Sequence, residues 1–479
     1  MTPAIAAPAG QLPPLCVDLD GTLIKSDTLF DGVCQFARRH PLSLWRLPIW
    51  LAGGRAHLKI EVARGAMLDA ARLPYNSNLL HYLQAQHREG RRLFLTTGAD
   101  GGLAQRVAAH LGIFEGVLAT DAGTNLTSTR KLARLEERFG QFDYVGNSSA
   151  DLPLLAHARE AMVANPSRGL RMGLLTRHIP IARTFTDRRP LGPTLLNAIR
   201  LHQWAKNILL LLPLILSHRL ATHSIAAAIT AFFCFSFMAS ANYLVNDMLD
   251  IESDRHHPSK RLRPFASGDL PVAVGIAMVL VLISCSVAIL PLLPAGFAFW
   301  LGVYIVATAS YSFYLKKIEV ADVLLLSGLY TLRMLAGGAA TGTEISHWLA
   351  GFSTFLFLSL AMVKRFSELE NLRERGSVST HGRGYLVADM EQIRTFGTSS
   401  AYAAVVVFML YIARPDVTEL YEHAGRLWLM VPLLLYWLTR VWLLASRGEL
   451  SEDPVIFAMR DKVSLLIGVG VLIVGILAI

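Results

Sequence analysis

Hydrophobic and polar positions divide the chain into two regions of different pattern. Up to about residue 178, short apolar runs such as 15–17 and 93–95 end in polar turns that contain glycine. From about residue 193 onward, apolar runs long enough to cross a bilayer follow one another, with short polar loops between them. The first pattern predicts an α/β domain built on buried parallel strands, and the second predicts an all-helical membrane domain.

The membrane region contains about nine candidate spans, centred near residues 210, 233, 281, 303, 330, 355, 405, 434 and 470. A polar, proline-bounded stretch at 179–192 separates them from the first region. We therefore expect an N-terminal domain at 1–178, a linker at 179–192 and a polytopic membrane domain at 193–479.

Composition supports a membrane protein. Hydrophobic residues make up 53% of the 479 residues and the mean hydropathy is +0.41, which is too apolar for an ordinary soluble protein. The net charge of +9 is scattered among apolar runs, so it fits lipid headgroups better than a nucleic-acid surface. The four cysteines are widely spaced and predict neither a disulfide framework nor a zinc site.

Basic residues indicate how the spans are oriented. Lys260, Lys316 and Lys364 are examples of the many bases that follow even-numbered spans, whereas the opposite loops contain few. By the positive-inside rule, the basic loops face the cytoplasm, and the N-terminal domain lies on the same side.

The first apolar run ends in Asp18, Asp20, Gly21 and Thr22. A buried parallel strand that ends in acidic residues presents them at the edge where α/β active sites form. This motif resembles the first motif of the haloacid dehalogenase superfamily, which consists mostly of phosphatases. The resemblance implies a Rossmann-like α/β fold with a helical cap, Asp18 as nucleophile, Asp20 as general acid and base, and a Mg²⁺ ion between carboxylate and phosphate.

The remaining motifs of that superfamily have counterparts further along the chain. Thr97 matches the phosphate-binding hydroxyl, Lys131 matches the phosphate clamp, and Asp151 matches the metal-binding acid. The resemblance therefore implies that Asp18, Asp20 and Asp151 hold the metal. Asn147 stands where the family commonly has Asp, so two alternatives stay open: an active phosphatase, or a retained fold that docks or regulates.

Residues 28–90 are mostly helical in pattern and are expected to form the cap. Within them, residues 42–51 are strongly apolar and contain two tryptophans, yet they are too short to cross a bilayer. Three interpretations fit this stretch: contact with the membrane surface, packing on the second domain, or a buried cap helix.

The most densely charged stretch of the membrane region lies at 242–268. If it is helical, Asp247, Asp250 and Asp254 fall at positions i, i+3 and i+7 and share one face. Clustered carboxylates repel one another unless a cation neutralises them, and hard oxygen ligands favour Mg²⁺ bound to a phosphorylated substrate. The alternative is a solvated, charged loop after a transmembrane helix.

Nine spans with this acidic motif between the second and third resemble the UbiA superfamily of intramembrane prenyltransferases. The resemblance implies that Asp247, Asp250 and Asp254 are metal ligands and that Asn242 and Asn246 support them. The same resemblance lets Lys260, Arg261 and Arg263 hold phosphate.

The second acidic motif of that superfamily is altered here. Residues 364–370 begin with two bases, Lys364 and Arg365, and leave Glu368 as the best-placed carboxylate. Together with residues 200–207, which include Lys206, this segment resembles the bacterial polyprenyl-phosphate phosphoribosyltransferase branch. In that branch phosphoribosyl pyrophosphate is the donor and a polyprenyl phosphate is the acceptor. The resemblance implies that Lys206, Lys364 and Arg365 hold phosphate groups.

Arg333 lies within the fifth span, where an unpaired charge is costly. We expect its partner to be a substrate phosphate or a nearby acid.

The sequence therefore predicts a bifunctional enzyme of the bacterial cytoplasmic membrane. Its membrane domain would transfer 5-phosphoribosyl to polyprenyl phosphate with Mg²⁺, and its N-terminal domain would remove the 5-phosphate from the product. The alternatives are an aromatic-acceptor prenyltransferase that consumes a polyprenyl diphosphate, with a regulatory or inactive phosphatase-like domain, a transferase for another activated sugar, and a non-enzymatic scaffold. The expected partners are the two substrates and the bilayer, without nucleic acid, and a homo-oligomer is compatible with the sequence.

Overall fold

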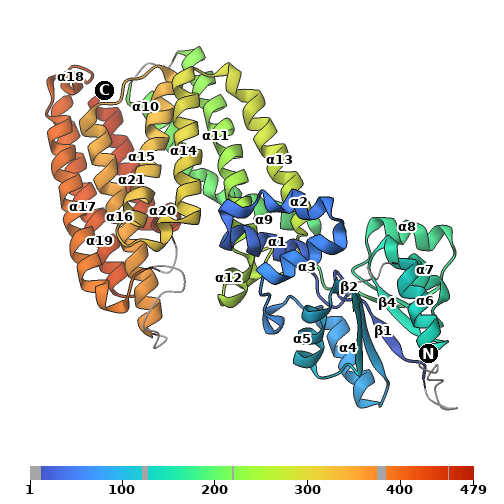
Figure 1. The fold of residues 1–479 in the computed structure, drawn as a ribbon. Coiled ribbons are helices and arrows are strands. Elements are labelled where there is room, and N and C mark those ends of the chain that lie inside the picture. The colour runs from blue at the N-terminus through green and yellow to red at the C-terminus, as the bar shows by residue number, and fades with distance from the viewer. Residues whose placement is uncertain (1–11, 121–127, 218–220, 375–383, 451–452) are drawn as a thin grey trace. The chain divides into compact units, whose positions relative to one another are not determined.

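The computed structural model describes residues 12–120, 128–217, 221–374, 384–450 and 453–479 (Figure 1). The chain divides into two compact units. Unit 1 comprises Met1–Arg200 and Tyr243–Leu280, and unit 2 comprises Leu201–Asn242 and Val281–Ile479. The acidic motif, expected as part of the membrane domain, therefore belongs mostly to the same unit as the N-terminal fold.

Unit 1 is built on a six-stranded parallel sheet with strand order β3-β2-β1-β4-β5-β6. The strands are β1 Leu15–Val17, β2 Leu93–Asp100, β3 Gly116–Thr120, β4 Asp143–Gly146, β5 Ala161–Ala164 and β6 Ile181–Phe185. The predicted parallel sheet is confirmed. Because β1 lies between β2 and β4, the residues that follow it stand where the strand order reverses, which is the usual ligand site of such sheets.

Helices cover both faces of this sheet. They are α4 Ser77–Arg88, α5 Gly101–Leu111, α6 Ser128–Phe139, α7 Leu152–His157 and α8 Arg168–Thr176. One apolar core includes Leu79, Leu83 and Leu103, and a second core includes Leu135, Leu154 and Leu170. The sheet is therefore buried on both faces, as its continuous apolar strands require.

The segment between β1 and β2 begins with three helices, α1 Thr28–Arg39, α2 Arg46–Ala52 and α3 Arg55–Gly65. The Asp27 side chain accepts hydrogen bonds from the amides of Leu29 and Phe30 and so fixes the start of α1. These helices occupy the part of the chain expected to form the cap.

The stretch expected as a linker at 179–192 contains the edge strand β6 and the start of α9 Leu191–Ile199. β6 pairs with β5 and is buried only at Phe185. The alternation of its sequence is weak because most of this edge strand is exposed, and for that reason it was not predicted as a strand.

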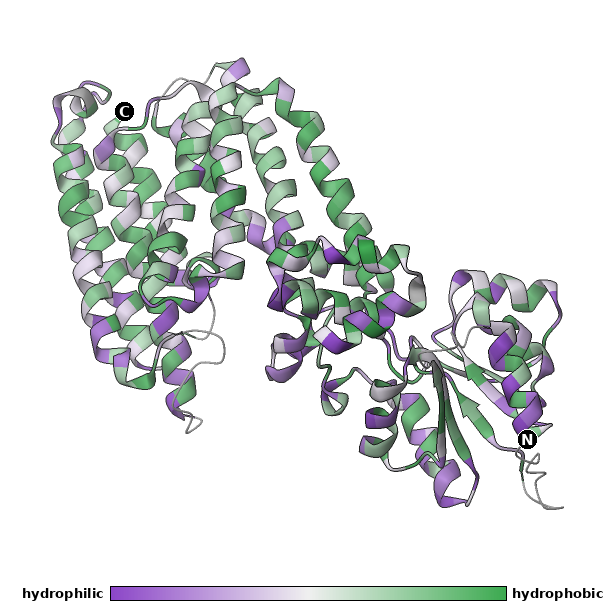
Figure 2. Cartoon of the chain, in the orientation of Figure 1, coloured by the Kyte–Doolittle hydropathy of each residue, from purple (hydrophilic) through white to green (hydrophobic). Residues whose placement is uncertain are grey.

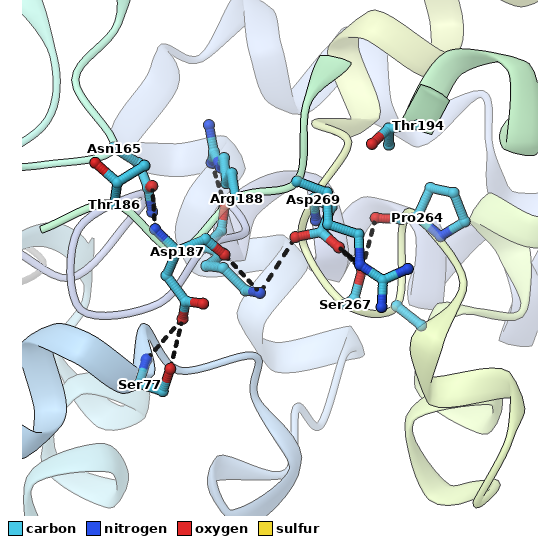
Figure 3. Close-up of polar contacts among 12 residues, drawn as sticks. Ser77, Asn165, Thr186, Asp187, Arg188, Thr194, Pro264, Ser267 and Asp269 are labelled. Carbon is cyan, nitrogen blue, oxygen red and sulfur yellow. Dashed lines mark hydrogen bonds and ion pairs between the residues drawn. The ribbon is translucent and has the colours of Figure 1, made fainter. Parts of the chain in front are cut away.

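Unit 1 also contains the end of α11 Thr222–Leu249, the short helix α12 Ile251–His256, the single turn Lys260–Leu262 and the start of α13 Val272–Ile289. Ion pairs join these segments to the N-terminal fold. Arg255 pairs with Asp31 at 2.7 Å, and both side chains are almost fully buried. Lys25 forms a second junction, because it pairs with Asp269 at 3.2 Å and also donates to the carbonyl of Asp187 at 3.4 Å. Figure 3 shows Asp187 and Asp269 at this junction.

Unit 2 is entirely helical among its described residues, and its long helices are apolar along most of their length (Figure 2). Its further elements are α10 Leu212–Leu216, α14 Ala295–Phe313, α15 Ala321–Thr341, α16 His347–Glu374, α17 Met390–Ile412, α18 Pro415–Thr418, α19 Met430–Ser446, α20 Pro454–Arg460 and α21 Lys462–Ala478.

Across both units, the described residues contain seven helices long and apolar enough to span a membrane, or eight if the bent pair α20 and α21 counts as one span. This is fewer than the nine predicted spans. The span expected near residue 210 is instead the 3-10 helix Leu201–Leu210 followed by α10. Pro213 stands at the start of α10, where it lacks an amide proton, and the polar Lys206 and Asn207 precede it, so no long apolar helix forms.

Candidate active sites

The first site lies at the carboxyl end of β1. Asp18 directly follows this strand, and its carboxylate accepts a hydrogen bond from Lys131 Nζ at 2.8 Å and one from Thr22 Oγ1 at 3.3 Å. Lys131 comes from α6, 113 residues further along the chain. The structure therefore brings together two residues that the sequence assigned to one phosphate site.

Asp151 joins the same network through a residue that the sequence reasoning missed. Lys131 Nζ also donates to the Tyr144 hydroxyl at 3.1 Å, and that hydroxyl donates to Asp151 Oδ1 at 2.9 Å. The other carboxylate oxygen of Asp151 accepts from the amides of Asn147 and Ser148. Tyr144 lies in the buried strand β4 and carries no motif signal, so only the fold identifies it.

Asn147 occupies a crowded position in this site. Gly21 has a φ of +71°, and a Cβ atom built there would lie 2.0 Å from the Asn147 side chain. Only glycine fits both this backbone conformation and this close approach. The amide side chain of Asn147 is thus held beside the turn that carries Asp18 and Asp20.

Asp20 and Thr97 are positioned mainly by backbone groups. Asp20 accepts a hydrogen bond at 2.8 Å from the amide of Thr28, the first residue of α1. Thr97 is fully buried near the end of β2, and its hydroxyl accepts from the amide of Ala99 at 3.0 Å. Asp20 is therefore held by the first cap helix, and Thr97 is held by the last residues of its own strand.

Two carboxyl groups of this site have raised pKa values. Burial raises the pKa of Asp18 to about 6, although the charge of Lys131 opposes the shift. Burial raises the pKa of Asp20 to about 8, and the charge of Asp27 adds to the effect. Burial therefore favours the protonated form of Asp20, which is the form that a proton donor needs.

A pocket with about 390 Å³ of empty space adjoins these residues. Its lining includes Thr28 and Ala99, whose amides contact Asp20 and Thr97. Most of the other lining residues are apolar, and Lys59 and Arg106 supply positive charge. Lys59 Nζ of α3 also donates to the carbonyl of Gly98 at 2.6 Å, so a cap residue contacts the end of β2 directly after Thr97.

The acidic motif of unit 1 is neutralised by arginines. Asp247 accepts a two-pronged contact from Arg200, with its shortest bond at 2.6 Å, and a further bond from Arg263 at 3.1 Å. Arg263 Nη1 also pairs with Asp254 at 2.8 Å. A single guanidinium nitrogen therefore contacts two of the three carboxylates, which places Asp247 and Asp254 on the same side of the motif.

The helix through this motif is interrupted. α11 ends at Leu249 and α12 begins at Ile251, with Asp250 between them. Asp250 accepts from the Asn246 amide at 3.1 Å and lies 3.5 Å from Arg38 of α1. Burial raises the pKa of Asp254 to about 6 against the charge of Arg263.

Of the other residues assigned to this motif, Lys260 acts on Asp254 through its charge, which opposes the rise in the pKa of that carboxyl group. Lys260 and Arg261 belong to the turn after α12, and Arg261 is exposed. Asn242 belongs to unit 2, where its amide donates to Thr308 at 3.1 Å.

Unit 2 contains a cluster of opposite charge balance. Lys206 and Lys364 both donate to the same oxygen of Asp453, at 2.8 and 3.0 Å. Burial alone would raise the pKa of Asp453, but the charges of the two lysines outweigh it and hold the pKa well below its usual value. Two cations share one anion, so the cluster carries excess positive charge. The sequence signal at Asp453, an acid before proline at a helix start, indicates only a helix cap.

Arg365 differs from its neighbour Lys364. Its side chain is fully buried and pairs with Asp322 at 2.6 Å and with Glu368. Its remaining nitrogen contacts the Tyr311 hydroxyl at 3.4 Å. The two bases that the sequence grouped together therefore have different partners: Lys364 pairs with Asp453, and Arg365 pairs with Asp322 and Glu368.

Arg333 is buried within α15, and no carboxylate among the described residues forms an ion pair with it. It donates to the Asn207 side chain at 2.9 Å and to the Leu329 carbonyl, and its guanidinium lies over the rings of Phe235, Tyr304 and Tyr330. An amide and three aromatic faces therefore stabilise this charge.

Within the described ranges, no three His, Cys, Asp or Glu side chains form a ready metal site. Mg²⁺ needs fewer, because it commonly takes one or two carboxylates and completes its shell with water and phosphate oxygens. In the acidic motif, Asp247 and Asp254 already share one positively charged nitrogen. In the N-terminal site, Asp18 and Asp151 are buried carboxylates joined through Lys131 and Tyr144. Both donor sets fit Mg²⁺.

Comparison with known proteins gives matches for both regions. The UbiA prenyltransferase family matches residues 208–463. A protein of Sinorhizobium fredii named y4nM is 35% identical over 460 residues, covering 95% of this chain and 89% of that protein. A decaprenyl-phosphate phosphoribosyltransferase of Corynebacterium glutamicum is 36% identical over 231 residues, covering 46% of this chain and 68% of that enzyme. The solved structure of a HAD family hydrolase from Salmonella enterica covers 38% of this chain and 68% of its own, with 16% identity and a TM-score of 0.26.

Proposed function

The chain belongs to the UbiA prenyltransferase family, and we propose that it transfers 5-phosphoribosyl from phosphoribosyl pyrophosphate to a polyprenyl phosphate. The observation that carries this proposal is the lysine pair on Asp453. An aromatic acceptor would gain nothing from two cations that share one anion, whereas a phosphate would supply the missing negative charge. The similarity to a decaprenyl-phosphate phosphoribosyltransferase supports the same choice of substrates.

In the proposed reaction, an oxygen of the lipid phosphate attacks C1 of the ribose while the bond from C1 to pyrophosphate breaks. Lys206 and Lys364 bind a substrate phosphate, and Asp453 holds both ammonium groups at one place. Asp247, Asp250 and Asp254 are the ligands for Mg²⁺, which when bound would withdraw charge from the leaving pyrophosphate. Asn246 orients Asp250 through its amide.

Arginines of unit 1 surround the acidic motif in this proposal. Arg200 and Arg263 balance the charge of Asp247, and Arg263 also reaches Asp254. Arg365 acts as a positioning residue because its guanidinium is engaged by Asp322 and Glu368. Because phosphoribosyl pyrophosphate is a soluble cytoplasmic compound, we infer that the loops of the motif face the cytoplasm, as the distribution of basic residues indicates.

We further propose that the N-terminal fold hydrolyses the 5-phosphate of the lipid-linked product. Asp18 attacks phosphorus to form an aspartyl phosphate, while Asp20 protonates the departing ribose oxygen; water then releases inorganic phosphate. The raised pKa of Asp20 supports its role as the acid. Lys131 lies where it can neutralise a phosphate beside Asp18, and Asp151 is held for metal binding by Tyr144 and Ser148.

The transferase proposal is tested by supplying polyprenyl phosphate, phosphoribosyl pyrophosphate and Mg²⁺ to the purified protein in lipid nanodiscs. We expect mass spectrometry of the lipid fraction to detect a ribosylated lipid, with pyrophosphate released in equal amount. A protein that instead consumes a polyprenyl diphosphate and leaves polyprenyl phosphate unchanged would contradict the proposal.

A further inference from the structure

The cap carries an apolar surface that faces outward. We call Leu42, Trp45, Ile49 and Leu51 the α2 surface; their exposed fractions are 84, 62, 59 and 52%. None of the seven residues of α2 is buried. The other tryptophan of this segment, Trp50, turns inward and packs on Phe36 of α1, with ring centroids 5.1 Å apart. One tryptophan therefore anchors α2 on the cap, and the other is presented on the outside.

Exposed apolar side chains gathered in one short segment usually mark a binding surface. The cap has its own buried residues, including Phe36 of α1 and Val62 of α3, so its folding does not require the α2 surface to be covered. The α2 surface is therefore available to bind a partner outside the cap.

Within unit 1, the cap is attached to the start of a membrane-spanning helix. α1 packs against α12, and Arg255 of α12 forms its buried ion pair with Asp31 of α1. Arg38, at the other end of α1, lies 3.5 Å from Asp250. The chain then continues from α12 into α13, which forms most of the candidate span Val272–Leu292.

A second attachment lies closer still to this span. Lys25 pairs with Asp269 at 3.2 Å, three residues before α13 begins. Gly268 has a φ of +73°, and a Cβ atom there would lie 2.7 Å from the side chain of Lys25. Figure 3 shows Asp187, Arg188 and Asp269 in the same polar network. The turn that leads into the span is therefore held against the N-terminal fold by close contact as well as by charge.

Basic residues flank the α2 surface. Arg39 ends α1 and Arg46 begins α2, and both are exposed. The Arg46 guanidinium lies 5.5 Å from the ring centroid of Trp45. Apolar side chains, an exposed tryptophan and neighbouring arginines are the combination that binds the interface of an anionic bilayer.

We propose that the α2 surface docks on the headgroup region of the anionic bilayer in which the chain's own spans lie. The apolar side chains enter the boundary between headgroups and acyl chains, and Arg39 and Arg46 contact lipid phosphates. A lipid surface is favoured over a protein partner because the same unit carries the start of a membrane span. Docking itself does not depend on the proposed phosphatase reaction.

Docking would have a consequence for the pocket beneath the cap, and this consequence rests on the proposed function. The pocket is lined by Leu29 of α1 and Val62 of α3, together with Lys59. A cap held at the bilayer favours amphiphilic phosphate esters that stay in the membrane over soluble sugar phosphates, because the lipid raises their local concentration.

The docking is tested by environment-sensitive fluorescence on the full-length protein. Leu42→Cys is labelled with a nitrobenzoxadiazole dye in a Cys285→Ser background, because Cys285 is exposed whereas Cys16, Cys34 and Cys234 are buried. Met172→Cys on α8 is the matched control, since Met172 is 64% exposed in the same unit. Nanodiscs contain either phosphatidylcholine alone or phosphatidylcholine with phosphatidylglycerol, with and without lipids spin-labelled near the headgroup.

We expect a blue-shifted emission at position 42 that spin-labelled lipids quench, and a stronger shift with phosphatidylglycerol. The emission of the label at position 172 should change neither with spin-labelled lipids nor with phosphatidylglycerol. Equal responses at the two positions would overturn the proposal. A label at 42 that is shielded from both iodide and the spin-labelled lipids would also overturn it, because protein, such as a second copy, would then cover the surface.

The consequence for substrate choice is tested with the double variant Trp45→Ser, Ile49→Ser and the matched control Met172→Ser, Leu175→Ser. We expect hydrolysis of the lipid-linked 5-phosphate to fall about fivefold or more in the first variant only, and hydrolysis of soluble p-nitrophenyl phosphate to stay unchanged in both. An equal loss on both substrates would contradict the consequence. If the wild-type protein hydrolyses neither substrate, the phosphatase proposal fails while the fluorescence experiment still decides the docking.

Discussion

The N-terminal site and the lysine cluster of unit 2 have opposite charge balances. In the first, Asp18, Asp20 and Asp151 share one lysine, and burial raises the pKa of Asp18 and Asp20. In the second, Lys206 and Lys364 share one aspartate, and their charges hold the pKa of Asp453 low. A site short of positive charge favours a metal ion, and a site with an excess favours an anion. Charge balance therefore indicates the ligand class of each site more directly than the number of charged residues does.

The largest expected effect comes from removing the nucleophile. Asp18→Asn keeps the size of the side chain but cannot form an aspartyl phosphate, so phosphate release should fall by at least about a thousandfold. Glu137→Gln is the control, because it neutralises a carboxylate on the exposed face of α6. A colorimetric assay of released phosphate measures the activity of both variants. Full activity of the Asp18→Asn variant would exclude Asp18 as the nucleophile.

The second effect concerns stability. Arg365→Met should destabilise the protein by about 3 to 5 kcal/mol, because it leaves Asp322 buried without its partner. Adding Asp322→Asn should restore much of the loss, since the uncompensated charge is then removed as well. Thermal unfolding in detergent tests the pair. If the single variant melts as the wild type does while transfer is lost, Arg365 contacts substrate rather than supporting the site.

A smaller effect is expected in the lysine cluster. Lys206→Met and Lys364→Met should each lower the rate of phosphoribosyl transfer by about 10- to 100-fold, because each removes a charge-assisted contact to phosphate. Lys317→Met is the control, since Lys317 is exposed on the turn after α14. The rate is measured at saturating and limiting polyprenyl phosphate. Unchanged rates in both variants would remove the cluster from the site.

The smallest effect is the pH dependence of Asp453. Its folded pKa is depressed, so its ion pairs stabilise the protein above the unfolded pKa near 4 and are lost as the pH falls through the folded value. Asp453→Asn should therefore cost a constant amount, about 2 kcal/mol or less, between pH 5 and 8, and the difference from wild type should shrink only below about pH 4. Thermal unfolding of both proteins from below about pH 4 up to pH 8 checks the direction of this change. A difference that grows on acidification would contradict the assignment.

The sequence was informative where the signal is local. The apolar run before Asp18 predicted both the central strand and the edge at which the acids stand, because a buried strand and its motif are adjacent in the chain. The UbiA motif at Asp247 was predicted for the same reason. The parallel α/β sheet and the helical membrane domain were therefore accessible without coordinates.

What could not be predicted depends on partners far away in the chain. Asp453 meets Lys206 across 247 residues, and Arg255 meets Asp31 across 224. Lys364 and Arg365 are neighbours in sequence, but adjacent positions on a helix point in different directions, so they pair with different acids. The segment near residue 210 had the composition of a span, yet Pro213 and the polar residues before it gave short helical turns.

The central claim is that one chain makes a phosphorylated lipid-linked ribose and then removes its phosphate. It is tested most directly by mass spectrometry of lipids formed from phosphoribosyl pyrophosphate and polyprenyl phosphate by the wild type and by Asp18→Asn. We predict that the wild type accumulates the ribosylated lipid without the 5-phosphate and that Asp18→Asn accumulates the same lipid with it. Identical products from the two proteins would contradict the claim.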